Sequence, residues 1–312
     1  MVDLRVRVGD LTLKNPVMPA SGTFSESLSR VLSFEQLGAL VTKTITAELR
    51  GGNPTPRVAE VGRGLLNSIG IPSKGLQYFL DHTLPAYESF SRPLVVSVSA
   101  PPADLFVDLV QRLVLPGVAA IEANISCPNI EEDGKAFAMQ AKSTSAVVDR
   151  LRKATSLPLW VKLTPNTGDI AGVARAAEAS GADALAVANT ILAMSIDIES
   201  FKPTLGNIMG GYSGPGIKPI VVRMVYQCAK AVDIPIIGCG GISSAADAIE
   251  YMLAGASAVQ VGTATFVNPS AMIEVISGLE TFCKRKGIKR VSELTGMVRD
   301  RDMAVDQLEA IP

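Results

Sequence analysis

Eight short apolar runs recur along the 312-residue chain, and each is followed by a stretch of helical periodicity that ends at Gly or Pro. The runs are continuous rather than alternating, which is typical of strands buried on both faces of a parallel sheet. They occupy residues 15–21, 39–44, 93–99, 119–126, 157–164, 182–190, 234–241 and 257–264, and helices are predicted between them at 102–114, 144–155, 169–180, 218–232 and 244–255. Eight strand–helix units of this length predict an α/β fold, the (β/α)8 TIM barrel.

The residues beyond a minimal barrel have predictable places. Charged and apolar residues alternate on both sides of Gly9-Asp10, which predicts an N-terminal β-hairpin that closes the barrel bottom. Segments 45–92 and 191–216 follow strands, so we expect long loops over the top face, where they usually cover an active site. No linker or shift in composition interrupts residues 1–312, which predicts a single domain. A doubly wound open sheet is the structural alternative, but the first strand is not followed by GxGxxG.

Charge and cysteine usage exclude several classes of function. The chain has 29 basic and 30 acidic residues, without the basic excess that nucleic-acid binding needs. We expect neither a signal peptide nor a membrane helix, because the longest uncharged stretch, 251–273, contains Gly, Asn and Pro. Four scattered cysteines without CxxC spacing predict no metal site and a reducing, cytoplasmic location.

Polar residues follow the predicted strands, at the barrel end where catalytic groups lie. Lys43 and Lys162 would be costly to bury there unless an anionic ligand supplied the counter-charge. The last two strands end in Gly240-Gly241 and Gly262-Thr263, which would present backbone N–H groups to a phosphate. The pattern predicts a phosphorylated cofactor, although each glycine alone could serve only a tight turn.

Cys127 is the leading candidate for a reactive group. It lies just beyond the fourth strand, near the amides Asn124 and Asn129, and a thiol placed there can act as nucleophile or general base. The other cysteines, Cys228, Cys239 and Cys283, are interpreted as small packing residues. The single histidine, His82, is expected at the surface or in packing.

Several motifs together resemble the dihydroorotate dehydrogenase family. They are NISCPN at 124–129, LLNSIG at 65–70, TKT at 42–44, VKL at 161–163, ANT at 188–190, GGYSGPGIKP at 210–219, GCGGI at 238–242 and VGTA at 261–264. A cysteine in NISCPN is typical of class 1 of that family. ASGTF at 20–24 and GNPTPRVAE at 52–60 look like the NAD-linked class 1B catalytic subunit.

The resemblance implies FMN-dependent oxidation of dihydroorotate to orotate in de novo pyrimidine biosynthesis. Cys127 would remove the C5 proton while a hydride passes from C6 to the flavin. The implied substrate residues are Lys43, Asn67, Ile69, Gly70, Ile71, Asn124, Asn129, Asn189 and Thr190. The implied FMN residues are Ser21, Lys43, Thr44, Asn124, Lys162, Ala188, Gly214, Gly240, Gly241, Gly262 and Thr263. Ser97 departs from the Asn that the family often has, so it is not among the expected contacts.

Class 1B also implies a partner, because this chain has neither a dinucleotide fingerprint nor clustered cysteines. The resemblance implies a homodimer core with electron-transfer subunits that hold FAD and a [2Fe–2S] cluster, in a heterotetramer. Three alternatives remain at this point: a flavin barrel like that of dihydropyrimidine dehydrogenase, a non-redox phosphate-binding barrel, and a non-enzymatic binding module. The thiol between two amides disfavours the last.

Overall fold

Eight parallel strands form the centre of the computed structural model, which describes residues 2–100, 103–126 and 137–298. In spatial order they are β3 (Val17–Pro19), β18 (Ala256–Val261), β17 (Ile236–Cys239), β12 (Ala184–Val187), β11 (Leu159–Lys162), β10 (Ala120–Asn124), β9 (Leu94–Val98) and β4 (Leu40–Val41). At the seam, the Gly38 N–H donates to the Val17 carbonyl at 2.9 Å, so the two end strands adjoin. Seven of the predicted apolar runs contain one of these strands, and the run 257–264 contains all of β18 except its first residue, Ala256; the barrel prediction is confirmed.

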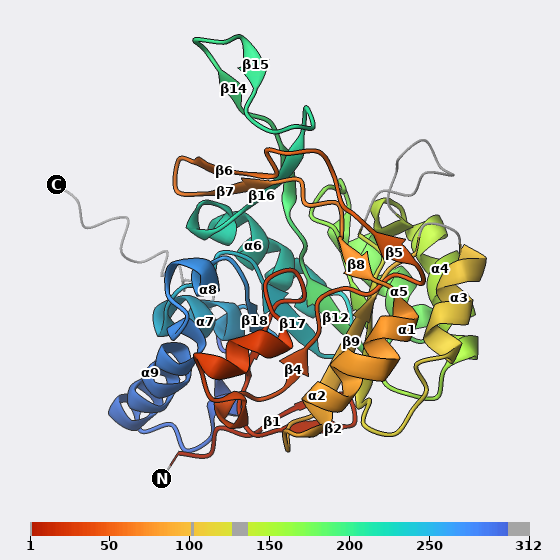
Figure 1. Cartoon of the computed structure of the whole chain (residues 1–312). Coiled ribbons are helices and arrows are strands. Elements are labelled where there is room, and N and C mark those ends of the chain that lie inside the picture. Colours follow the sequence, from red (N-terminus) through yellow and green to blue (C-terminus); the bar gives the residue numbers. More distant parts are fainter. Residues whose placement is uncertain (1, 101–102, 127–136, 299–312) are drawn as a thin grey trace, which may run out of the picture.

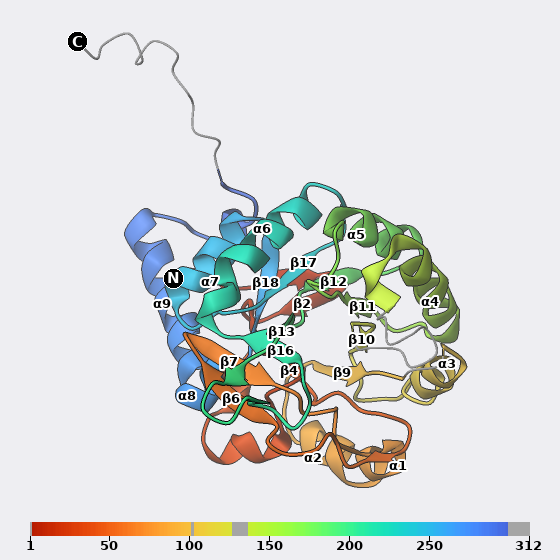
Figure 2. The same cartoon turned by 90° about the horizontal axis from the view of Figure 1, so that it is seen from above.

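Helices surround the barrel (Figure 2) and cover the outer face of its strands, so the strands are buried on both faces. They are α3 (Ala103–Gln111), α4 (Ala141–Ala154), α5 (Ile170–Ala179), α6 (Lys218–Ala229), α7 (Ala245–Leu253), α8 (Ala264–Val267) and α9 (Ala271–Lys286). The five predicted helices are present, with some ends shifted by up to three residues. None of the helices in the described part of the chain is long and apolar enough to cross a membrane.

The N-terminal hairpin lies beneath the barrel, as predicted (Figure 1). It pairs β1 (Val6–Val8) with antiparallel β2 (Leu11–Leu13), and Val8 and Leu13 are fully buried. The turn residue Gly9 has φ +59° and approaches the residue that precedes β12, at the amino end of the barrel strands. The hairpin therefore covers the end of the barrel opposite to the predicted site.

The two long loops meet above the barrel and form a second sheet, called here the roof. It has the order β13 (Ile191–Ala193), β16 (Gly210–Ser213), β7 (Gly64–Asn67) and β6 (Val58–Val61), all antiparallel. Beyond it, β14 (Ile196–Asp197) and β15 (Lys202–Pro203) form an arm that projects away from the molecule (Figure 1). The sequence predicted the loops but not their pairing.

The remaining elements are short and lie mostly beside β4 or at the ends of barrel strands. They are β5 (Leu49–Arg50), β8 (Ser73–Lys74), α1 (Leu76–Tyr78), the π-helical turn η3 (Phe79–Thr83), α2 (Leu84–Glu88) and the 3-10 turns η1 (Glu26–Arg30), η2 (Phe34–Gln36), η5 (Phe137–Met139), η6 (Pro215–Ile217) and η7 (Val291–Leu294). The thiols of Cys228, Cys239 and Cys283 are buried, as predicted. His82 is exposed and stacks on Tyr78 with ring centroids 4.4 Å apart.

Candidate active site

A buried polar group lies inside the barrel just below its carboxyl end. Lys162, the last residue of β11, is 4% exposed, and its Nζ donates to Ser21 Oγ at 3.3 Å and to Gln260 Oε1 at 3.1 Å. Glu122 of β10 is fully buried, and its Oε1 is 3.8 Å from the same Nζ. The predicted FMN residues Ser21 and Lys162 are therefore in contact although 141 residues separate them.

Three polar residues form a cluster at the ends of β10 and β12. The Ser126 hydroxyl donates to Asn124 Oδ1 at 2.5 Å and accepts from Asn189 Nδ2 at 2.5 Å. Two predicted substrate residues are thus joined by the residue that immediately precedes Cys127. Cys127 itself and Asn129 lie outside the described residues.

Glycine-rich turns lie side by side at the ends of the seventh and eighth strands. Gly241 has φ +70°, and a Cβ there would come within 2.7 Å of the Gly214 carbonyl oxygen. Thr263 Oγ1 donates to Ser213 Oγ at 2.9 Å, which brings the eighth strand's end to the same place. Gly262 packs against Ala20, next to Ser21, so these turns continue into the Lys162 group.

The turns leave backbone donors available. Among the described residues, the N–H groups of Gly241, Gly262 and Thr263 donate to no other residue. Such adjacent N–H groups at strand-to-helix turns form an anion-binding concavity. With Lys162 on the same rim, this donor set fits a phosphorylated flavin.

The roof brings two further predicted substrate residues, Asn67 and Thr190, to the same place. Asn67 Nδ2 donates to the Gly211 carbonyl at 3.0 Å, and Gly211 packs directly against Thr190, leaving no room for a side chain. Gly70 and Ile71 have positive φ values of +77° and +47°, which turn the chain back after β7. Pairing of β7 with β16 therefore places two distant loops on one side of the rim.

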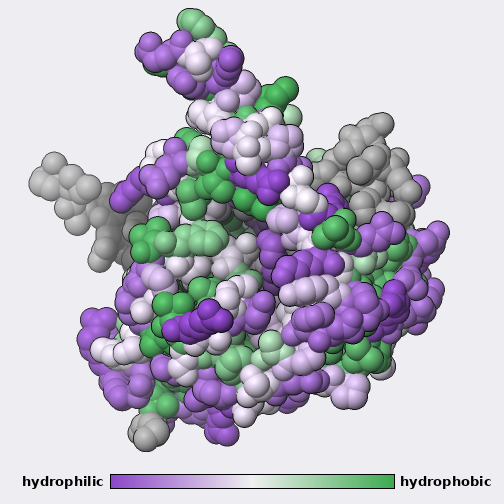
Figure 3. Space-filling model, in the orientation of Figure 1, coloured by the Kyte–Doolittle hydropathy of each residue, from purple (hydrophilic) through white to green (hydrophobic). Residues whose placement is uncertain are grey.

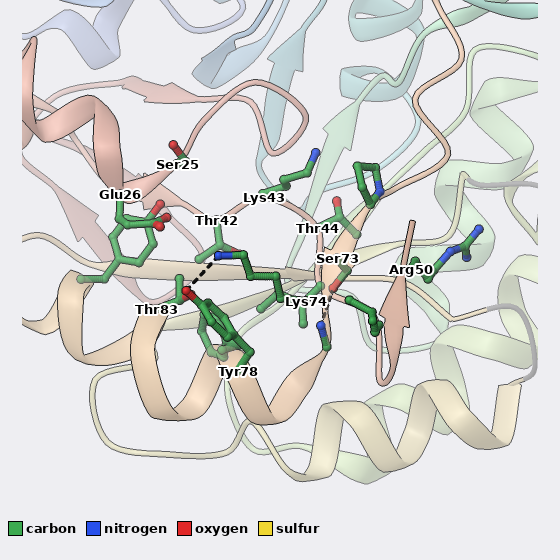
Figure 4. Close-up of a pocket in the computed structure, with 16 residues that line it drawn as sticks. Ser25, Glu26, Thr42, Lys43, Thr44, Arg50, Ser73, Lys74, Tyr78 and Thr83 are labelled. Carbon is green, nitrogen blue, oxygen red and sulfur yellow. Dashed lines mark hydrogen bonds between the residues drawn. The ribbon is translucent and has the colours of Figure 1, made fainter. Parts of the chain in front are cut away.

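Lys43 and Thr44 follow β4 and line a pocket of about 380 Å³ between this strand and α1–α2 (Figure 4). In Figure 4 the Lys43 side chain points away from Tyr78 and Thr83, on the far wall of that pocket. Burial lowers the pKa of the Lys43 ammonium group. Thr44 Oγ1 is 3.0 Å from Ser97 Oγ, so the fully buried Ser97 contacts a predicted FMN residue directly.

The sequence reasoning missed Glu122 and Gln260. The signal was present, because each is a large polar residue flanked on both sides by apolar residues within a predicted strand. Gln260 Nε2 donates to Glu122 Oε2 at 2.6 Å across the barrel interior. The last predicted FMN residue, Ala188, is 2% exposed, and its N–H donates to the Cys239 carbonyl at 2.9 Å.

Comparisons with known proteins agree with this geometry. The family model described as "Dihydroorotate dehydrogenase" matches residues 3–283. The "Dihydroorotate dehydrogenase B (NAD(+)), catalytic subunit" of Desulforamulus reducens is 47% identical over 298 residues, covering 95% of this chain and 98% of the relative. The protein of the same name from Bacteroides fragilis is 46% identical over 299 residues, covering 95% and 99%.

A solved structure, that of an Eimeria tenella DHODH in complex with ferulenol, has the same fold with a TM-score of 0.76 at 23% identity. The structural match covers 95% of this chain and 88% of the Eimeria tenella chain. The family match sets aside the non-redox barrel and the binding module that the sequence alone left open. The chain belongs to the dihydroorotate dehydrogenase family, and its similar relatives are NAD-linked catalytic subunits.

Proposed function

We propose that FMN is the flavin this chain uses when it oxidises dihydroorotate to orotate in pyrimidine biosynthesis. The observation that carries this proposal is the set of backbone N–H groups at Gly241, Gly262 and Thr263 that donate to no other described residue, together with a buried lysine at the same end of the barrel. The glycine turns would hold the phosphate, together with Gly214 and Gly240. Ser21, Thr44, Asn124, Lys162 and Ala188 would hold the ring system and its side chain.

Cys127 would be the base that removes the C5 proton. Ser126, hydrogen-bonded to Asn124 and Asn189, anchors the chain directly before it. FMN, when bound, accepts the hydride from C6 of the substrate. Lys162 would stabilise the negative charge that accumulates on the ring, because a fixed ammonium group in a dry site costs no reorganisation.

The substrate would lie between this rim and the roof. Amide groups of Asn67, Asn124, Asn129 and Asn189 and the Thr190 hydroxyl match the donors and acceptors of a planar cyclic imide. A wrong substrate would leave buried amides unpaired, which is costly. Lys43 would pair with the substrate carboxylate, and Ile69, Gly70 and Ile71 would cover the ring.

The catalytic-subunit names of the relatives imply a partner subunit. We assign FAD and a [2Fe–2S] cluster to that partner, in a cytoplasmic heterotetramer built on a homodimer of this chain. Residues 1–312 would form its single FMN-binding domain.

The test is anaerobic mixing of the FMN-loaded protein with dihydroorotate while flavin bleaching is followed. We expect Cys127→Ala to slow bleaching by roughly 10²-fold or more, because a positioned base contributes about that factor. Cys283→Ala, in a buried thiol of α9, is the control and should bleach at the normal rate. Equal rates for wild type and Cys127→Ala would remove Cys127 as the base.

A further inference from the structure

A series of hydrogen bonds connects the carboxyl ends of β12 and β10. The Thr190 backbone N–H donates to Asn189 Oδ1 at 2.8 Å. Asn189 Nδ2 then donates to Ser126 Oγ, and Ser126 Oγ donates to Asn124 Oδ1, both at 2.5 Å. A single hydroxyl therefore joins two predicted substrate residues that come from different strands.

The Thr190 backbone group fixes the direction of the whole series. A backbone N–H can only donate, so the Asn189 atom that faces it is the oxygen, and the Asn189 nitrogen faces Ser126. Ser126 Oγ accepts from that nitrogen and has one hydrogen to donate. Asn124 Oδ1 is the acceptor for this hydrogen, and turning the Asn124 amide over would leave the hydroxyl with no acceptor in the described part of the chain.

The nitrogen of the Asn124 amide is the group left to meet a ligand. Asn124 pairs with Lys162 in the sheet register and lies two residues after Glu122 in β10, so its side chain is on the interior face of the barrel. Asn124 is 6% exposed, and its oxygen is occupied by Ser126. Among the residues that the structure describes, none accepts a hydrogen bond from Asn124 Nδ2.

We propose that Ser126 is a positioning residue that sets substrate specificity: its hydroxyl holds the Asn124 amide so that N–H donors, and not the oxygen, face a ring carbonyl of the substrate. The inference rests on the substrate site proposed above. A cyclic imide offers carbonyl oxygens as acceptors. An amino group in place of that carbonyl would set donor against donor in a buried site, which is costly.

The main experiment is isothermal titration calorimetry of the FMN-loaded protein with orotate and with its cytosine and isocytosine counterparts, in which an amino group replaces one or the other ring carbonyl oxygen. Wild type should bind at least one counterpart about tenfold or more weaker than orotate. Ser126→Ala leaves the Asn124 amide free to turn over, so this ratio should fall by about fivefold or more. Ser126→Thr keeps the hydroxyl and should keep the wild-type ratio.

Reversal of the hydrogen-bond direction provides a second variant. In Asn189→Asp one carboxylate oxygen keeps the Thr190 N–H and the other accepts the Ser126 hydrogen. Ser126 Oγ must then accept from Asn124, whose oxygen turns toward the substrate, so the preference for orotate should be lost or inverted.

Asn166→Asp is the matched control, because it introduces the same charge in a neighbouring amide. Asn166 contacts Thr190 and Leu192 through their backbone and takes no part in the Ser126 series. All three ligands carry the same carboxylate, so an added charge affects them alike. Asn166→Asp should therefore keep the wild-type ratio even where it weakens binding.

The ratio separates specificity from a purely structural role, since a distorted site would weaken all three ligands by one factor. Wild type that binds both counterparts as tightly as orotate, or a ratio unchanged in Ser126→Ala and Asn189→Asp, would overturn the proposal. Thermal unfolding checks that each variant is folded, and Asn189→Asp decides the question if Ser126→Ala is not. Failure of wild type to bind orotate would instead contradict the substrate site.

Discussion

At the scale of single residues, the proposed site contains two lysines in different environments. Lys43 is partly buried, and this burial lowers the pKa of its ammonium group. Lys162 lies deeper and has Glu122 beside it. The two lysines at strand ends therefore lie in different environments, which agrees with the different roles proposed for them, Lys43 toward the substrate carboxylate and Lys162 toward the flavin.

The environment of Lys43 predicts a pH dependence of substrate binding. Lys43 is charged below its pKa, so its attraction for the dihydroorotate carboxylate is lost as pH rises through that lowered value. We expect KM to increase on the alkaline side. Lys43→Arg should remove this increase, because a guanidinium stays charged. The measurement is KM against pH; an unchanged profile in Lys43→Arg would show that another group titrates.

At the scale of elements, the turns after the last two barrel strands form the proposed phosphate site. Gly241 and Gly287 offer a matched pair, since both have φ +70°. A Cβ at Gly241 would collide with the Gly214 carbonyl, whereas Gly287, which ends α9, has open space around it. Alanine substitutions at the two positions therefore separate the strain of a positive φ, which both positions share, from the collision, which occurs only at Gly241.

We expect Gly241→Ala to weaken FMN binding by at least about tenfold and to cost about 1–3 kcal/mol of stability, because it forces a strained backbone and a collision. Gly287→Ala should cost about 1 kcal/mol and leave FMN binding unchanged. Fluorescence titration with FMN and urea unfolding measure the two quantities. Equal FMN affinity in both variants would argue against a phosphate site at Gly241.

Asp247, in the first turn of α7, predicts that the stability of the fold decreases in acid. Burial opposes ionisation of Asp247, but bonds from Lys218, Ser243 and Ser244 outweigh it and lower the pKa of this carboxyl from 3.8 to about 2. Its contribution is therefore complete above about pH 4 and is lost as pH falls toward 2. Lys218 Nζ lies 2.8 Å from Asp247 Oδ1, which fixes α7 to α6.

Asp247→Asn should lower the free energy of unfolding by about 1 kcal/mol at pH 7, a value reduced for partial solvent screening. Its deficit should shrink between pH 4 and pH 2, where wild type loses the same contribution. Asp108→Asn, on the exposed side of α3, is the control and should change neither quantity. A deficit that stays constant to pH 2 would show that ionisation of Asp247 does not stabilise the fold. Urea unfolding at several pH values measures the free energy of unfolding of each variant.

At the scale of the whole molecule, the arm carries large apolar side chains that are exposed. Phe201 and Ile198 are 87% and 75% exposed, and Figure 3 shows apolar residues among polar ones along the arm. Other large apolar side chains on or near it are exposed too, namely Leu192, Met194, Ile196, Ile208 and Met209. Apolar surface concentrated in this way is typical of an interface.

We therefore expect the combined change Ile198→Ser and Phe201→Ser to weaken assembly of the complex without lowering thermal stability, because these side chains pack against little within the chain. Sedimentation velocity over a range of protein concentrations measures the assembly. Val31→Ser, at an exposed residue outside the arm, should leave assembly unchanged. Assembly that is equally strong in the arm variant would place the interface elsewhere.

The sequence by itself determined the eight strands, the five predicted helices and the hairpin, because continuous apolar runs and helical periodicity are local properties of the chain. Motif positions also indicated Lys162, Asn124, Asn189 and the glycine turns. Only the tertiary structure decided that β7 pairs with β16, and that Gln260 reaches across the barrel to Glu122. Such contacts join residues more than 130 positions apart, and they depend on how the barrel closes rather than on any local pattern.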